Sequence, residues 1–507
     1  MTDLLELTQI MDGYKLRQIE VLTRPLRPGI QESRYRLMYH ALANGDVHTE
    51  EEAAQLLGLD VKGRPFRRFL LEFRRRLYAP LLFLDTESSE QFNATQKANF
   101  ECLRKLGIFQ TLLHRKCFIN AAMLAEEIVE IAAQNDVTLV ALEMATYLKR
   151  YFVEQEPNPD KYRYYKVYVE RFRFDWEAEN KAAECYSAVI APAIKKKSNQ
   201  YDIALKSKEL LNILEPYSNR CNTILFLAGY YGVMLTEKMS LFAWKKALDI
   251  CDIAIERLRA KSCFSPRMIG FFMINKTTCL SMLGQYEEAI KLNIECADFE
   301  VYGSRGWFVN QDVQVSVALR AGEYSLAHSV AEKVISNPMF KLMPKIMHES
   351  WQILFSYISV IQSIGKVKLN ANDNIVFQQF KLNKFLNDVP TYSKDKKGLN
   401  IPILIVQLLF LLHQKEYEQA HERLEALRKY RVKHFRYDAG NFRTQLFLKA
   451  ITTMAGSAFN KKKFIKKSQP FIEQLRNTPI GYPDQHYKIE IIPYTLVWNW
   501  MVEMIDQ

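Results

Sequence analysis

Residues that break helices are scarce in this 507-residue chain, which contains 18 glycines and 17 prolines. All-β folds need many tight turns and usually require more of both residue types. The composition therefore favours long helices joined by short connections. The length exceeds that of most single domains, so we expect several domains or an extended repeat array.

Long apolar runs are also scarce. Residues 1–17 alternate apolar and charged side chains and lack the apolar core of a signal peptide. The most apolar stretch, residues 401–412, is interrupted by Gln407 and is too short to span a bilayer. The eight cysteines form no CxxC pair, which is typical of buried thiols in a reducing compartment. We therefore expect a cytoplasmic protein without a membrane span.

Sequence motifs for catalysis are missing. The chain contains no glycine-rich phosphate loop, no HExxH metal motif and no G-x-S-x-G nucleophile elbow. The nine histidines are scattered, and the paired carboxylates at residues 126–127 and 287–288 suit solvent-facing helix positions. We expect a protein that is not an enzyme and that needs no cofactor or metal. The alternative is an active site assembled from distant residues, which no local motif reveals.

A helical-hairpin pattern recurs along the chain. Its two tight copies read G-x-Y-x-x-A and begin 38 residues apart: Gly284, Tyr286 and Ala289 in the first, and Gly322, Tyr324 and Ala327 in the second. Looser copies keep the aromatic and the small residue: Trp244 with Ala247, Tyr417 with Ala420, and Phe118 with Ala121.

Each position of this pattern has a physical role. The glycine or polar residue closes a tight turn, the aromatic begins the second helix, and the small residue lets the two helix backbones approach closely. A single hairpin cannot bury its apolar face, so neighbouring hairpins must stack into a solenoid. Five copies in a helix-rich chain therefore predict an all-α fold.

The pattern resembles that of the tetratricopeptide-repeat superfamily, most clearly over residues 271–338 and in degenerate form over residues 103–430. This resemblance implies a right-handed α-solenoid of stacked helical hairpins. The whole chain also resembles an uncharacterised family of bacterial helical-repeat proteins, mainly through residues 385–410, FLNDVPTYSKDKKGLNIPILIVQLLF. The second resemblance implies the fold and the length but no function.

We expect four segments along the chain. Residues 1–90 form a small helical N-terminal module, and residues 91–365 carry degenerate tetratricopeptide-like repeats. Residues 366–400 contain no clean repeat and form an irregular insertion, which either lies on a functional face or is a long connection. Residues 401–507 hold C-terminal repeats and a tryptophan-rich helix at 491–504, which is either a cap or a docking face.

The N-terminal module contains signals for two helices. Thr49 is a suitable N-cap before three glutamates, and Gly58 suits a helix stop. A second helix is predicted over residues 65–78. Its apolar residues share one stripe: Phe66, Phe69, Leu70, Phe73 and Leu77. A helix, a turn and a basic helix in this order resemble a helix-turn-helix DNA-binding unit.

The second helix is strongly basic. Between positions 61 and 80 the chain contains seven basic residues and one acidic residue, Glu72. The planar fork of an arginine suits phosphate and guanine recognition. The candidate nucleic-acid contacts are Arg64, Arg67, Arg68, Arg74, Arg75 and Arg76. Against this interpretation, the turn at 58–65 is longer than a compact helix-turn-helix has, and Leu71 lies near the basic face. The alternative is a helical cap that shields the first repeat.

Other basic segments are less specific. Aromatic and basic residues alternate over residues 161–174, but Tyr162, Tyr165, Val169 and Phe172 share one helix face and predict core. Residues 428–436 and 461–467 form either helix ends favoured by the dipole or part of an anion-binding groove. The net charge of +12 permits a polyanionic partner without requiring one.

Two functions fit these observations. The leading hypothesis is a scaffold or adaptor that binds a protein or peptide segment along a helical-repeat surface. The second is a nucleic-acid-binding regulator, whose N-terminal module contacts DNA or RNA while the repeats sense a peptide or protein. Only the second hypothesis requires the arginines to lie together on an exposed face.

Overall fold

The computed structural model describes most of the chain, namely residues 34–81, 94–194, 200–263, 266–367, 400–435, 442–478 and 490–505, with Leu4, Thr8 and Phe92. Over these residues the protein is all-helical, with twenty α-helices and no strand. None of these helices has both the length and the apolar character needed to cross a membrane. Most of the insertion predicted at 366–400, residues 368–399, lies outside the described residues.

The chain divides into two compact units, Met1–Tyr168 and Val169–Gln507. The helices of the first unit are α3 (Arg34–Asn44), α4 (Glu50–Leu57), α5 (Arg64–Leu81), α6 (Ala94–His114), α7 (Phe118–Gln134) and α8 (Thr138–Glu154). The next helix, α9 (Pro159–Ile194), begins in the first unit and ends in the second.

The second unit contains the remaining helices, which are α10 (Gln200–Ser218), α11 (Ile224–Ser240), α12 (Trp244–Arg259), α13 (Pro266–Met282), α14 (Tyr286–Cys296), α15 (Arg305–Ala321), α16 (Tyr324–Ile335), α17 (Lys345–Ser363), α19 (Asn400–His413), α20 (Tyr417–Phe435), α21 (Phe442–Thr452), α22 (Lys461–Arg476) and α23 (Tyr494–Met504). Short 3₁₀ turns η2 (Ala297–Phe299), η3 (Pro338–Leu342) and η7 (Ala455–Ser457) join some of them.

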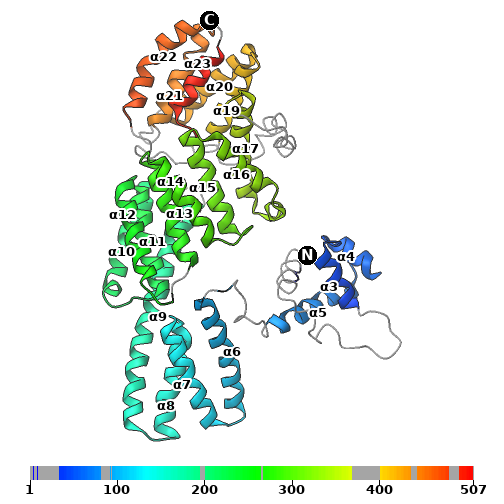
Figure 1. Ribbon diagram of the computed structural model, residues 1–507, viewed down its shortest axis with the longest axis vertical. Helices are drawn as coiled ribbons and strands as arrows, with labels where there is room; N and C mark the ends of the chain where they lie inside the picture. The colour runs from blue at the N-terminus through cyan, green and yellow to red at the C-terminus, as the bar shows by residue number, and fades with distance from the viewer. Residues whose placement is uncertain are drawn as a thin grey trace. The chain divides into compact units, whose positions relative to one another are not determined.

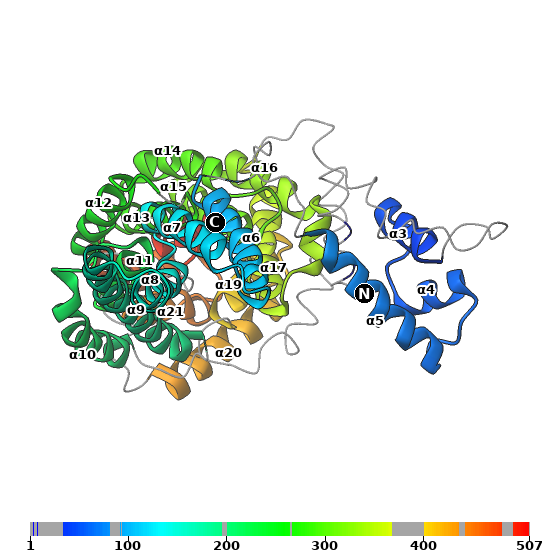
Figure 2. The same cartoon turned by 90° about the horizontal axis from the view of Figure 1, so that it is seen from below.

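Within each unit, helices that follow one another in sequence pack side by side (Figure 1). This holds for α6 to α8 in the first unit, and for α10 to α17 and α19 to α23 in the second. Helices two apart, such as α13 and α15, also touch. In Figure 2, α10, α12, α14 and α16 form one layer and α11, α13, α15 and α17 form the other. The stacking of hairpins expected from the sequence is therefore present in two layers.

The hairpin turns share one geometry. Each of the five aromatic residues is the first residue of a helix: Phe118 of α7, Trp244 of α12, Tyr286 of α14, Tyr324 of α16 and Tyr417 of α20. The residue two positions earlier is left-handed, with φ of 58° at Lys116, 54° at Phe242, 80° at Gly284, 82° at Gly322 and 60° at Lys415. The intervening residue donates its N–H to the carbonyl five positions back, at 2.9–3.0 Å. This bond closes a Schellman-type turn.

The small residue of the pattern is also where the sequence predicts it. The side chain three positions after each aromatic is fully buried: Ala121, Ala247, Ala289, Ala327 and Ala420. The predicted positions of the turn, the aromatic and the small residue are thus confirmed in all five hairpins, but the turn residue Phe242 is neither glycine nor polar, contrary to the prediction. A sixth turn of the same geometry, at Asp136, precedes Thr138 at the start of α8. The sequence pattern misses this turn because no aromatic residue follows it.

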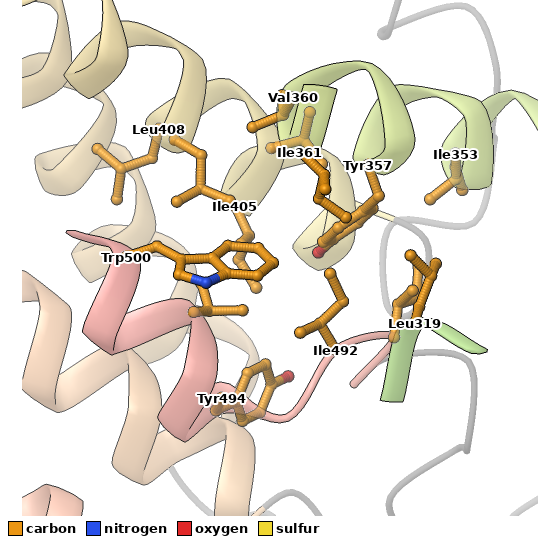
Figure 3. Close-up of a cluster of buried hydrophobic side chains, with 14 of the residues drawn as sticks. Leu319, Ile353, Tyr357, Val360, Ile361, Ile405, Leu408, Ile492, Tyr494 and Trp500 are labelled. Carbon is orange, nitrogen blue, oxygen red and sulfur yellow. The ribbon is translucent and has the colours of Figure 1, made fainter. Parts of the chain in front are cut away.

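The C-terminal helix α23 belongs to the core of the second unit. Figure 3 shows Trp500 of α23 facing Ile405 and Leu408 of α19, beside Tyr357 of α17. Trp500 and its neighbour Trp498 are both buried. The tryptophans therefore hold α23 in place and are not available as a docking face.

Candidate nucleic-acid interface

The short helix α4 is fixed at both ends by its own sequence. The Thr49 hydroxyl accepts the N–H of Glu52 at 3.2 Å, and the Glu52 carboxylate accepts the N–H groups of Thr49 and His48 at 3.1 and 2.7 Å. These backbone hydrogen bonds lower the pKa of the Glu52 carboxyl. At the other end Gly58 is left-handed, with φ of 65°, and Leu59 donates its N–H to the Ala54 carbonyl at 2.9 Å. Both predicted boundaries are confirmed.

A six-residue connection, residues 58–63, leads from α4 to α5. The Asp60 carboxylate accepts the N–H of Lys62 at 3.2 Å, and the Asp60 carbonyl accepts the N–H of Gly63 at 2.9 Å. Pro65 is the second residue of α5, where a missing N–H costs nothing. The connection is longer than the three or four residues of a compact helix-turn-helix, as the sequence indicates.

One face of α5 builds a small core with α3 and α4. Phe66, Phe73 and Leu77 are fully buried, and the Phe69 ring stacks on Tyr35 of α3 with centroids 4.8 Å apart. Buried residues from the other two helices complete the cluster: Met38, Tyr39, Ala41, Leu42, Ala53, Ala54 and Leu57. The apolar stripe predicted for α5 therefore packs the three helices together, with Leu70 partly buried at its edge.

The opposite face of α5 is exposed and basic. It carries Arg64, Arg67, Arg68, Leu71, Arg75 and Tyr78, all exposed. The last five of these positions lie 3, 4, 7, 11 and 14 residues after Arg64, which places all six on one side of a helix with 3.6 residues per turn. We call this set of six residues the α5 basic face. It contains four arginines and no acidic residue.

The six arginines predicted from the sequence divide into two groups. Arg74 and Arg76 are only partly exposed and flank the basic face. The Arg76 guanidinium lies 4.2 Å from the centre of the Tyr35 ring and 3.3 Å from the Glu72 carboxylate. Glu72 is therefore directed to the edge of α5. Its contact with Arg75 is longer, at 3.9 Å, and the Arg75 side chain is 74% exposed.

The remaining arginines of the basic face are not neutralised. Among the described residues, Arg64, Arg67 and Arg68 have no ion-pair partner. From Arg64 to Arg75 the helix rises about 16 Å, so four guanidinium groups are presented along three helical turns. Such a row can contact several phosphates in succession, and an α-helix fits the major groove of duplex DNA.

Other basic segments serve different roles. On α9, Tyr165, Val169 and Phe172 are buried, so their predicted place in the core is confirmed, whereas Tyr162 is only partly buried. The dipole interpretation of residues 461–467 is wrong, because Lys461 to Lys463 form the first turn of α22, at the positive end of its dipole. On α20, Arg428 pairs with Glu425 at 3.1 Å.

A buried ionic cluster in the second unit was not predicted. Arg443 of α21 donates to both carboxylate oxygens of Glu490, at 2.8 and 2.7 Å, and to the Leu475 carbonyl at 2.8 Å. The Glu490 carboxylate also accepts the N–H of Tyr494, and the Glu490 carbonyl accepts from Arg320 of α15 at 3.3 Å. Both members of the ion pair are buried, so the cluster joins helices and does not face solvent.

The cysteines offer little chemistry. All except Cys117 are buried, and burial raises the pKa of the Cys102 thiol to about 11. A thiol with such a pKa stays protonated and unreactive at neutral pH. Within the described ranges, no group of three or more histidine, cysteine, aspartate or glutamate side chains is arranged to hold a metal ion.

Of the surfaces described, the α5 basic face therefore has the most specific chemistry. Its residues were found in the sequence, whereas the direction of Glu72 and the packing of Arg76 on Tyr35 required the structure. Comparison with known proteins adds no identity: no protein-family model, no curated protein and no solved structure matches the chain.

Proposed function

We propose that this chain is a nucleic-acid-binding regulator that contacts its ligand through the α5 basic face. The observation that carries the proposal is the row formed by Arg64, Arg67, Arg68 and Arg75, which share one exposed side of a helix that contains a single acidic residue. Arginine in this setting binds phosphate through charge-assisted hydrogen bonds. The three-helix core behind α5 holds the row in one orientation, which lowers the entropic cost of binding.

The alternative, a cap that only shields its neighbours, explains these side chains less well. A solvated face on a helix usually mixes acids and bases, because pairs of opposite charge three or four residues apart stabilise the helix. On α5, Arg64 precedes Arg67 by three residues and Arg68 by four, and like charges at this spacing are destabilising. A polyanionic ligand would remove this repulsion.

The helical hairpins supply the second part of the proposal. We propose that they form a right-handed, tetratricopeptide-like solenoid that binds a protein or peptide segment. The support is the five hairpins of common geometry, together with exposed apolar side chains at Ile119 and Met123 of α7, which are 70% and 65% exposed. These two residues lie one turn apart and resemble the anchors of a helical-repeat binding surface. A scaffold without nucleic-acid binding is the function that remains if the test below fails.

The test is fluorescence anisotropy of the full chain with short duplex DNA and single-stranded RNA over a salt series. The variant R64A/R67A/R68A is compared with K462A/K463A/K466A, which removes the same charge from exposed positions of α22. Removing three phosphate contacts should reduce the magnitude of the slope of log K against log salt for duplex DNA by up to about 2.7. We expect this loss in the arginine variant, and parent-like slopes in the lysine variant.

Two results would contradict the proposal. One is absence of salt-sensitive binding by the parent chain to either ligand. The other is equal loss in both triple variants, which would indicate a general effect of net charge. Far-ultraviolet circular dichroism controls for folding, and all six substituted side chains are exposed, so helix content should not change.

A further inference from the structure

Leu71 is the one aliphatic side chain of the α5 basic face. It is 58% exposed, although the apolar stripe of the same helix is packed against α3 and α4. Arg67 and Arg68 precede it by one turn, and Arg75 follows it by one turn. Leu71 therefore occupies the centre of the row of arginines.

Neither packing in the three-helix core nor phosphate binding explains a leucine at this position. Its side chain adds nothing to the three-helix core, because it lies on the opposite face from Phe66 and Phe73. Phosphate oxygens offer it no favourable contact, and an arginine or lysine there would strengthen phosphate binding. A leucine gains free energy at this site only when an apolar group of the ligand covers it.

The place of Leu71 in the row determines which part of a nucleic acid it reaches. When a helix lies in a groove, residues toward the edges of its exposed face contact the two backbones, and the central residues point to the base edges. Arg67 and Arg68 lie on either side of Leu71 around the helix axis, so their contacts with the two backbones would hold that orientation. In the major groove of DNA, the apolar group presented by a base is the C5-methyl of thymine.

RNA does not offer the same contact. The major groove of an A-form RNA helix is too deep and narrow for side chains to read, and uracil lacks the methyl group. We therefore propose that α5 enters the major groove of duplex DNA and that Leu71 packs on a thymine methyl, so that the site selects thymine-containing DNA over RNA. This inference rests on the proposed nucleic-acid binding and adds the ligand class and a specificity residue.

The experiment compares one duplex in two chemical forms. A duplex is enriched from a random pool by the full-length parent chain and then prepared with thymine or with deoxyuridine, which removes only the methyl groups. Covering one methyl group corresponds to about a fourfold change in affinity. We expect the parent to bind the thymine form about fourfold more tightly per contacted methyl, and the variant L71A to bind both forms equally.

The control variant is R67A, which should weaken binding to both forms by the same factor, because its phosphate contact does not depend on the methyl group. Equal binding of the two forms by the parent would overturn the inference, as would a thymine preference that L71A retains. Binding of the corresponding RNA duplex as tightly as DNA would also overturn it. In each of these cases the proposed function still stands, whereas absence of binding to every nucleic acid defeats both.

Discussion

Replacing Gly229 of α11 with alanine tests the close packing of this helix on α9. A methyl group at Gly229 would lie 2.8 Å from the Ala182 β-carbon, and 3.1 and 3.2 Å from the carbonyl carbon and oxygen of the same residue. Two of these three atoms belong to the backbone, so no side-chain rotation relieves the clash. The two helices must move apart, and the buried contacts around them loosen.

The magnitude follows from two opposing effects. Alanine in a helix interior is normally more stable than glycine by about 0.5–1 kcal/mol. Overpacking in a well-packed core costs about 1–3 kcal/mol. We expect the overpacking to dominate and G229A to lower the free energy of unfolding by about 0.5–2 kcal/mol. The assay is urea unfolding followed by circular dichroism.

Gly107 provides the matched control, because it lies in the interior of α6 and has no atom within 4 Å of the added methyl group. G107A should therefore raise stability by about 0.5–1 kcal/mol. Removing the opposing methyl group with A182G in the G229A background should recover part of the loss, which appears as a coupling free energy between the two sites. If G229A were as stable as the parent, the inferred contact between α9 and α11 would be refuted.

Two further predictions concern charged groups. R443M should lower the free energy of unfolding by about 3–5 kcal/mol, because it leaves Glu490 buried without its ionic partner. In the same denaturation assay, the double variant R443M/E490M should be more stable than R443M. A double variant that is less stable than R443M would contradict this reasoning. The second concerns Glu52, whose carboxyl pKa is lower in the folded protein than its ordinary value of 4.5. The Glu52 carboxylate therefore stabilises the fold at pH values above 4.5, and this stabilisation is lost as the pH falls through the lowered pKa. Amide exchange in α4, corrected for intrinsic pH effects, should therefore accelerate on acidification, and E52Q, which keeps a hydrogen-bond acceptor without the charge, should remove this pH dependence.

Most of the fold could be predicted from local sequence because the hairpin turns are local structures. In the five hairpins, the aromatic and the alanine three positions later mark the start of the second helix. Glycine is a poorer marker, since Lys116, Phe242 and Lys415 adopt the same left-handed conformation as Gly284 and Gly322. The backbone hydrogen bonds of the turn outweigh the cost of about 1 kcal/mol for a non-glycine residue there.

The candidate site was predicted less completely. Helical spacing alone places Arg64, Arg67, Arg68 and Arg75 on one side of α5, because the buried phenylalanines define the other side. It does not reveal that Arg76 packs on Tyr35, since that contact joins residues of different helices. The cluster at Glu490 has the same origin, because its partners are distant in sequence and no local pattern indicates which charges will be buried together.

The hydrogen bond between Arg320 and the Glu490 carbonyl joins residues 170 positions apart. In a simple stack each hairpin touches only its neighbours, so the terminal helices can fray one at a time. In this protein, unfolding of α23 would expose the buried cluster of Arg443 and Glu490, which also holds α15 and α21. The helices of the C-terminal part of the second unit should thus unfold together as one cooperative unit, because Glu490 contacts both α15 and α21.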